Sequence, residues 1–306
     1  MTYRLGTRGS LLARRQAELI REQLGHCAPD VEWTIVPITA SADQRPEAPL
    51  ATISGEGIFV KELEHALLRD DIDLAVHSLK DIPLEGSPPA LVMAAIPERE
   101  EPHDALVSRE GHRLMQLPHR ARLGSSSLRR QSQLLHLRPD LEIVPIRGNV
   151  DTRLKQLETE RLDGVVVAAA GLMRLGLQHR ISDVLHALIP EPGQGALAVQ
   201  IRQADTTLHE MVRALDDAPT RLAVETERHV LRALGGGCRV PIGALAEIRG
   251  GTMRLQGVVA SPDGKRLIRR EVMGPAETAD RMATQLAEQL CVSGAREILS
   301  ARSSAG

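Results

Sequence analysis

LGTRGSLLARRQ at residues 5–16 is echoed by LGSSSLRRQ at residues 123–131. In each stretch a short apolar segment stops at glycine with serine or threonine, and a segment with helical spacing begins there. Each helix leads to a segment that ends in VPI, at 36–38 and at 144–146. The order strand–helix–strand therefore occurs twice, which predicts an α/β fold with two lobes.

The segments around these stretches extend the alternation of strands and helices. We predict strands at 3–7, 31–39, 72–76, 122–124, 141–146, 164–170 and 195–201, and helices at 10–24, 59–69, 126–137 and 150–157. Residues 40–57 contain two prolines and two glycines, which predicts a long mobile loop. The strand at 195–201 is expected to return to the first lobe.

The pattern changes after Pro219. A helix is predicted at 221–234, then three sequential strands at 242–248, 253–260 and 266–273, and two helices at 276–290 and 294–301. This order predicts a smaller α+β domain with a three-stranded antiparallel sheet. The predicted domains are residues 1–97 completed by 195–215, residues 98–194, and residues 218–306.

Length and composition indicate a globular protein of two or three domains, with 306 residues, 42% apolar and 25% charged. Only Tyr3, Trp33 and Phe59 are aromatic. The core must therefore consist mainly of Leu, Ala, Val and Ile. The scarcity of rings also argues against a protein that binds single-stranded nucleic acid, because such proteins usually stack bases on several rings. A net charge of −2 predicts no general attraction to nucleic acid or to anionic membranes. Three cysteines without CxxC spacing, and no apolar signal core at the N-terminus, predict a cytoplasmic protein.

Both repeated stretches place a helix N-terminus directly after a strand, where free backbone N–H groups can bind an anion. In the second lobe, hydroxyls and guanidiniums gather around such a start, from Ser125, Ser126, Ser127, Arg129, Arg130, Arg147 and Arg153. This set suits a carboxylate or a phosphate in a cleft. The alternative is a set of surface arginines on helices, which describes most of the arginines in the chain.

HSLKDIP at 77–83 combines a hydroxyl, an ammonium and a carboxylate directly after a buried strand. Ligands of open α/β sheets bind at this end of the strands. Lys80 and Asp81 could be a surface ion pair of little value. Because Lys80 is one of only four lysines, its place beside Asp81 favours function. His77 is expected to be structural.

Cys238 follows three glycines in LGGGCRVP at 234–241. Glycines allow backbone conformations that could present the thiol at a loop tip, and neighbouring Arg239 would favour the nucleophilic thiolate. The motif alone fits equally well a small buried residue after a glycine helix stop. Cys27 and Cys291 have no such setting and are expected to be structural.

Together with GIFVKELE at 57–64, IRGNVDTR at 146–153, AAAGLMRLGL at 168–177, PGQGAL at 192–197 and GGGCRVPIG at 235–243, these motifs resemble the porphobilinogen deaminase family. The resemblance runs from Leu5 to about Gly243, and the last sixty residues match in pattern. It implies a monomeric, cytoplasmic transferase of tetrapyrrole (haem, chlorophyll or corrin) biosynthesis. It also implies three domains, the first two like type II periplasmic binding lobes.

The family reaction joins four porphobilinogen molecules head to tail into hydroxymethylbilane and releases ammonia at each step. The implied primer is a dipyrromethane cofactor, fixed by a thioether to Cys238. Asp81 matches the catalytic carboxylate, which stabilises cationic species and moves protons. Phe59 matches a residue that covers the cleft. The implied substrate- and cofactor-binding residues are Arg8, Ser10, Ser78, Lys80, Ser125, Ser126, Ser127, Arg129, Arg130, Arg147, Gly148, Arg153, Arg174 and Gln194.

Three positions depart from the family pattern. Glu56 stands where many members carry lysine, residues 39–43 replace a common T-x-G-D, and Gln200 stands where glutamate is usual. Two alternatives to the family reaction stay open at this point. One is a non-catalytic two-lobed anion-binding or sensor protein, and the other is a cysteine hydrolase that would need His229 as its base.

Overall fold

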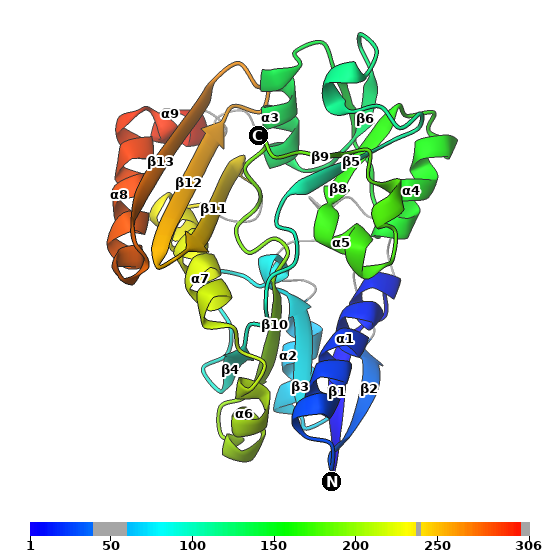
Figure 1. The fold of residues 1–306 in the computed structure, drawn as a ribbon, viewed down its shortest axis with the longest axis vertical. Helices are drawn as coiled ribbons and strands as arrows, with labels where there is room; N and C mark the ends of the chain where they lie inside the picture. Colours follow the sequence, from blue (N-terminus) through cyan, green and yellow to red (C-terminus); the bar gives the residue numbers. More distant parts are fainter. Residues whose placement is uncertain (39–59, 237–239, 301–306) are drawn as a thin grey trace. The chain divides into compact units, whose positions relative to one another are not determined.

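The computed structural model describes residues 1–38, 60–236 and 240–300, whose helices and strands are labelled in Figure 1. The chain forms two compact units. The first unit is Met1–Glu100 with Ala196–Arg221, and the second is Glu101–Gly195 with Leu222–Gly306. The finer boundaries of the three predicted domains stay a prediction.

The first unit contains a five-stranded sheet in the order β2-β1-β3-β10-β4. Its strands are β1 (Thr2–Arg8), β2 (Glu32–Ile38), β3 (Leu74–Ser78), β4 (Leu91–Ala95) and β10 (Leu197–Arg202). The first three run parallel, and β10 lies antiparallel between β3 and β4. A segment from late in the chain therefore joins the first sheet, which confirms that the strand predicted at 195–201 returns to the first lobe.

The second unit contains a sheet with the same plan, in the order β7-β6-β8-β5-β9. Its strands are β5 (Asp104–Ser108), β6 (Arg122–Gly124), β7 (Glu142–Val144), β8 (Gly164–Ala168) and β9 (Asp183–Val184). The neighbouring strands β7, β6 and β8 again run parallel. Strand β5 pairs antiparallel with β8, and β9 pairs antiparallel with β5. The repeat seen in the sequence is thus a repeat of sheet topology, and the predicted α/β class is confirmed.

The predicted three-stranded antiparallel sheet is present, and it belongs to the second compact unit. It consists of β11 (Ile242–Arg249), β12 (Thr252–Ala260) and β13 (Leu267–Pro275), with α8 (Ala279–Val292) and α9 (Ala295–Ser300) packed against it (Figure 1). The turn between β12 and β13 contacts α3 (Leu128–Leu137), where Nδ1 of His136 lies 2.9 Å from the carbonyl of Gly264. A Cβ at Gly264 would lie 2.6 Å from the backbone nitrogen of His136, so this turn requires glycine.

The other helices are α1 (Leu11–Cys27), α2 (Lys61–Leu68), α4 (Val150–Thr159), α5 (Ala169–Arg174), α6 (Thr206–Arg213) and α7 (Ala218–Ala233). Ser10, the first residue of the helix predicted at 10–24, caps α1, because its hydroxyl accepts from the N–H of Ala13. The helix predicted at 126–137 begins two residues later, at Leu128, with Ser127 as its cap. The strand predicted at 164–170 ends at Ala168, and α5 begins there. These shifts are small because local pattern marks the type of an element better than its ends.

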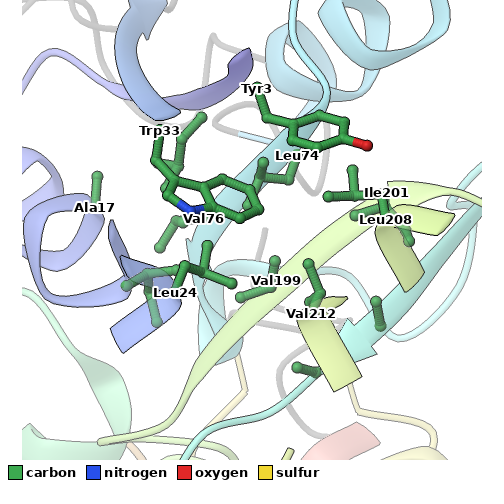
Figure 2. Packing of buried hydrophobic residues seen from close by; sticks show 14 of the residues in the cluster. Tyr3, Ala17, Leu24, Trp33, Leu74, Val76, Val199, Ile201, Leu208 and Val212 are labelled. Atoms are coloured by element: carbon green, nitrogen blue, oxygen red, sulfur yellow. The ribbon is translucent and has the colours of Figure 1, made fainter. Parts of the chain in front are cut away.

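Two aromatic side chains share the core of the first unit, which adds to the aliphatic core that composition predicted. The rings of Tyr3 and Trp33 stack with centroids 5.3 Å apart. Figure 2 shows them beside side chains of α1, β3, β10 and α6, including Leu24, Val76 and Val199. This cluster fixes one face of the sheet against its helices. In the described parts of the chain, no helix is long and apolar enough to cross a membrane.

Candidate functional site

The first unit gathers five predicted site residues at one edge of its sheet. Arg8 is the last residue of β1, and Ser10 follows it as the cap of α1. Ser78 is the last residue of neighbouring β3, and a 3₁₀ helix holds Lys80 and Asp81 directly after it. All five are half-buried. Because β1 and β3 are parallel, their carboxyl ends meet at the same edge, where open α/β sheets bind ligands.

Ser78 is tied to the helix that Ser10 caps. Nε2 of buried Gln16, on α1, donates to Oγ of Ser78 at 3.0 Å. The sequence predicted that HSLKDIP follows directly after the strand at 72–76. Instead His77 and Ser78 belong to β3, and Leu79–Asp81 forms a turn of 3₁₀ helix. The reason is the pairing of β3 with β10, which continues to the pair of Ser78 with Leu197.

A buried hydrogen-bonded chain lies beneath this edge. Nε2 of His77 donates to Oε1 of Gln200 (3.0 Å), and Nε2 of Gln200 donates to Oε1 of Glu64 (3.1 Å). Ser87 Oγ also donates to Glu64 (2.8 Å). Burial lowers the pKa of His77 to about 4, although the bond to Gln200 opposes this shift. His77 is therefore neutral at pH 7 and structural in position. Gln200, the departure noted above, is the amide that joins the histidine to the carboxylate.

The second unit repeats the arrangement at the carboxyl edge of its own sheet. The three serines follow β6, the predicted pair of arginines opens α3, and Arg174 ends α5 after β8. The serines hold this turn together internally. Ser125 is buried, and its Oγ accepts from the N–H of Ser127 (3.3 Å). Ser126 Oγ donates to the carbonyl of Ile146 (2.5 Å), and Ser127 caps α3.

Arg129 and Arg130 converge on one buried carboxylate, Asp104. Arg129 forms a fork, with Nη1 to Oδ2 at 2.7 Å and Nη2 to Oδ1 at 3.2 Å. Nε of Arg130 donates to Oδ1 at 2.8 Å. Gln194 Nε2 donates to the same Oδ1 at 2.9 Å. The side chains of the two arginines are 4% and 6% exposed and that of Asp104 is 0% exposed, so this cluster is internal to the second unit.

Burial by itself would raise the pKa of Asp104. The charges of Arg129 and Arg130, with the hydrogen bonds of Arg129 and Gln194, more than offset burial and hold the pKa of this carboxyl well below its usual range. Asp104 is therefore an anion, and the cluster of two guanidiniums and one carboxylate carries a single net positive charge. Nε of Arg129 is buried without a hydrogen-bond partner among the described residues.

The other predicted residues of the second unit lie on loops and helices that follow the strands at the same carboxyl edge. Arg147 and Gly148 are exposed after β7, and Gly148 has a φ of 97°. Nε of Arg153 donates to the Gly148 carbonyl (2.8 Å), and Nη2 of Arg174 donates to the Gly195 carbonyl (2.6 Å). A Cβ at position 148 would lie 2.7 Å from Cγ2 of Thr152, so this turn needs glycine.

Two predicted site residues, Cys238 and Phe59, lie outside the described residues, as do Arg239, Glu56 and residues 39–43. The base of the alternative hydrolase, His229, lies on α7 with Nδ1 3.3 Å from Oδ1 of Asp280. Among the described residues there is no group of His, Cys, Asp and Glu side chains that could hold a metal ion.

Sequence reasoning missed Asp104 and Glu227. Glu227 is fully buried on α7 and accepts from the N–H groups of Gly193 (2.7 Å) and Ala246 (2.9 Å). It thereby joins α7 to the PGQGAL loop and to β11. The one signal for either residue was a charged side chain beside a strongly apolar segment. Such a residue is costly to bury unless it is paired.

The chain matches two family models. The porphobilinogen deaminase dipyrromethane cofactor binding domain matches residues 3–210, and the porphobilinogen deaminase C-terminal domain matches residues 221–291. A porphobilinogen deaminase of Syntrophotalea carbinolica is 48% identical over 97% of this chain and 95% of the relative. One of Desulforudis audaxviator is 48% identical over 96% of each chain.

Solved structures show weaker likeness. The methionine binding protein MetQ has a TM-score of 0.44 at 14% identity, covering 72% of this chain and 92% of its own. An arginine-specific periplasmic binding protein of Salmonella typhimurium has a TM-score of 0.37 at 13% identity, covering 72% and 93%. The two family models, by contrast, together match residues 3–210 and 221–291, and both relatives match over nearly the whole of each chain. The chain belongs to the porphobilinogen deaminase family.

Proposed function

We propose that this chain is a transferase that joins four porphobilinogen molecules head to tail into hydroxymethylbilane, with release of ammonia at each step. The observation that carries the proposal is the likeness to curated porphobilinogen deaminases over nearly the whole of both chains. The arrangement of each sheet adds support, because the predicted binding residues lie at the edge where α/β sheets bind ligands.

The chemistry of the substrate explains the choice of residues. Each pyrrole carries an acetate and a propionate, so a growing chain accumulates carboxylates. Guanidinium groups bind carboxylates through paired hydrogen bonds, which a lysine ammonium cannot form. Arginines are present at both carboxyl edges, with Arg8 in the first unit and, in the second, Arg129, Arg130, Arg147, Arg153 and Arg174. The proposal assigns them to the carboxylates of substrate and product.

The dipyrromethane cofactor fits the donors of the second unit. It bears carboxylates, and the unit offers the exposed Arg147 and a buried donor, Nε of Arg129, that has no partner within the described part of the chain. When bound, the cofactor supplies the pyrrole to which the first porphobilinogen is joined. We assign its attachment to Cys238 and its carboxylates to the arginines of this unit. The serines at the start of α3 are assigned to hold that turn in place.

Asp81 is the proposed acid–base group. It lies half-buried at the carboxyl edge of the first sheet, beside Lys80. A carboxylate there can stabilise a cationic pyrrole species as ammonia leaves, and it can accept the proton that the newly joined ring releases. Ser78, hydrogen-bonded to Gln16, fixes the strand end from which Asp81 follows.

Porphobilinogen is the proposed partner, in a monomer that acts without nucleic acid or membrane. The net charge of −2 supports the last two parts of this proposal. The cytoplasmic location expected from the sequence stays a prediction. A non-catalytic anion-binding protein is not favoured, because the relatives that match at high identity bear the name of the enzyme.

The intact mass of the purified protein tests the proposal. We expect the mass of the chain plus two condensed pyrroles, together with ammonia release from porphobilinogen. Cys238→Ser should lose both the added mass and the activity, whereas Cys27→Ser and Cys291→Ser should keep both. A parent protein with only its sequence mass and no ammonia release would overturn the proposed reaction. A fully active Cys238→Ser would overturn the attachment site alone.

A further inference from the structure

Asp104 is the point at which three separate segments of the second unit meet. It begins β5 and pairs with Ala168, the last residue of β8, so its carboxylate lies at the carboxyl edge of the sheet. The carboxylate accepts from Arg129 and Arg130 of α3 and from Gln194 of the PGQGAL loop. The carbonyl of Pro102 also accepts from Gln194 Nε2, at 2.8 Å.

The orientation of both guanidiniums depends on this carboxylate. Neighbouring residues of a helix point in different directions, yet Arg129 and Arg130 meet at Oδ1 of Asp104. Backbone carbonyls hold the outer nitrogens, with Arg129 Nη1 to Ile189 at 3.1 Å and Arg130 Nη1 to Val166 at 3.1 Å. Without the carboxylate, two like charges would lie buried side by side, and each long side chain would be free to turn towards water.

We infer that Asp104 is a positioning residue, which holds Arg129 and Arg130 in one arrangement for the carboxylates of the substrate and the growing chain. The inference rests on the proposed function, in which these two arginines bind such carboxylates. Asp104 acts through the arginines and does not itself touch the substrate. It also reduces the charge of the pair to one, so the pair keeps its attraction for an anion at a lower cost of burial.

Two roles of Asp104, positioning the arginines and only stabilising the fold, predict different kinetics for its variants. If Asp104 only stabilised the fold, its loss would reduce the folded fraction, which lowers apparent kcat and leaves KM unchanged. If it positions the arginines, folded protein binds porphobilinogen less well and KM rises. The measurements are therefore kcat and KM for ammonia release, on protein whose folded fraction is known from circular dichroism and whose primer is confirmed by intact mass.

The variants are Asp104→Asn, which keeps the shape and removes the charge, and Asp104→Glu, which keeps the charge and displaces it. The matched control is Asp140→Asn. Asp140 forms a fork with Arg138 in the same unit, at 2.7 and 2.8 Å, and holds no predicted binding arginine. It should leave KM at the parental value.

We expect Asp104→Asn to lower kcat/KM roughly 10- to 100-fold, mainly through KM, which is the range for one charge-assisted hydrogen bond. Asp104→Glu should recover part of this loss. If Asp104→Asn does not fold, a raised KM in Asp104→Glu supports the inference, and a parental KM in it overturns it. In folded Asp104→Asn, a KM equal to that of the parent also overturns the inference. A KM below that of the parent overturns it as well, because it would mean that Asp104 competes with the ligand. An inactive parent without primer would instead count against the proposed function.

Discussion

Acid should destabilise this protein through His77. His77 is only 5% exposed, and burial lowers its pKa to about 4. In the unfolded chain a histidine has a pKa of about 6.5. Below pH 6.5 the unfolded state therefore takes up a proton that the folded state refuses until about pH 4. The contribution of neutral His77 to the free energy of unfolding is present above pH 6.5 and is lost as the pH falls towards 4.

The magnitude follows from the separation of the two pKa values. A difference of about 2.5 units corresponds to roughly 3 kcal/mol in the free energy of unfolding, of which roughly 2.5 kcal/mol should be lost between pH 7.5 and pH 4.5. For a domain whose total stability is about 5–15 kcal/mol, this is a large share.

Urea unfolding at a series of pH values measures the effect. His77→Gln is the test variant, because its amide can still donate to Oε1 of Gln200 and cannot titrate. The difference in unfolding free energy between parent and variant should change by about 2–3 kcal/mol across this range in favour of the variant at low pH. His209→Gln is the control, since His209 is exposed on α6 and stays in water in both states. Parallel loss of stability in parent and His77→Gln would refute the reasoning.

Two further predictions concern the proposed site. Asp81→Asn should slow single-turnover ammonia release about 10²–10⁴-fold in protein that carries its primer, because an amide cannot move the proton; Asp81→Glu should lose less, and turnover of Asp81→Asn within a few-fold of the parent would assign the proton transfer to another group. Arg129→Lys and Arg130→Lys should weaken primer assembly, measured by intact mass, or elongation, measured by ammonia release. Lysine cannot reproduce the fork of Arg129 to Asp104 or the Nε contact of Arg130 with it. The change to lysine should be tolerated at Arg14, which is exposed, and at Arg15, whose partners Glu18 and Glu22 lie on the surface. Equal losses of activity at Arg14 and Arg15 and at Arg129 and Arg130 would show that general arginine richness had been mistaken for a site.

Much of the architecture could be predicted because it is local. The stop of a strand at glycine and serine, and the helical spacing that follows, are properties of neighbouring residues. They predicted β1 with α1 and β6 with α3 to within three residues at each end. The same holds for the three strands after Pro219. The shorter strands β4, β5 and β9 were missed, since so few residues carry little periodicity.

The candidate site divides in the same way. The motifs around Asp81, Arg129 and Cys238 were visible in the sequence, because each places its chemical groups within a few neighbouring residues. The partner of the two arginines was not visible. Asp104 lies 25 residues before Arg129 and 90 before Gln194, and its place beside an apolar segment does not show which residues it pairs with.

By itself, therefore, the sequence determined the class of fold, the family and the positions where anions are expected to bind. Only the tertiary structure decided that Gln200 joins His77 to Glu64, and that Asp104 collects both arginines in the interior. The physical reason is that burial decides whether a polar group needs a hydrogen-bond or ion-pair partner. In water a carboxylate or an imidazole needs no partner, whereas inside a folded unit it must find one among segments that are distant along the chain.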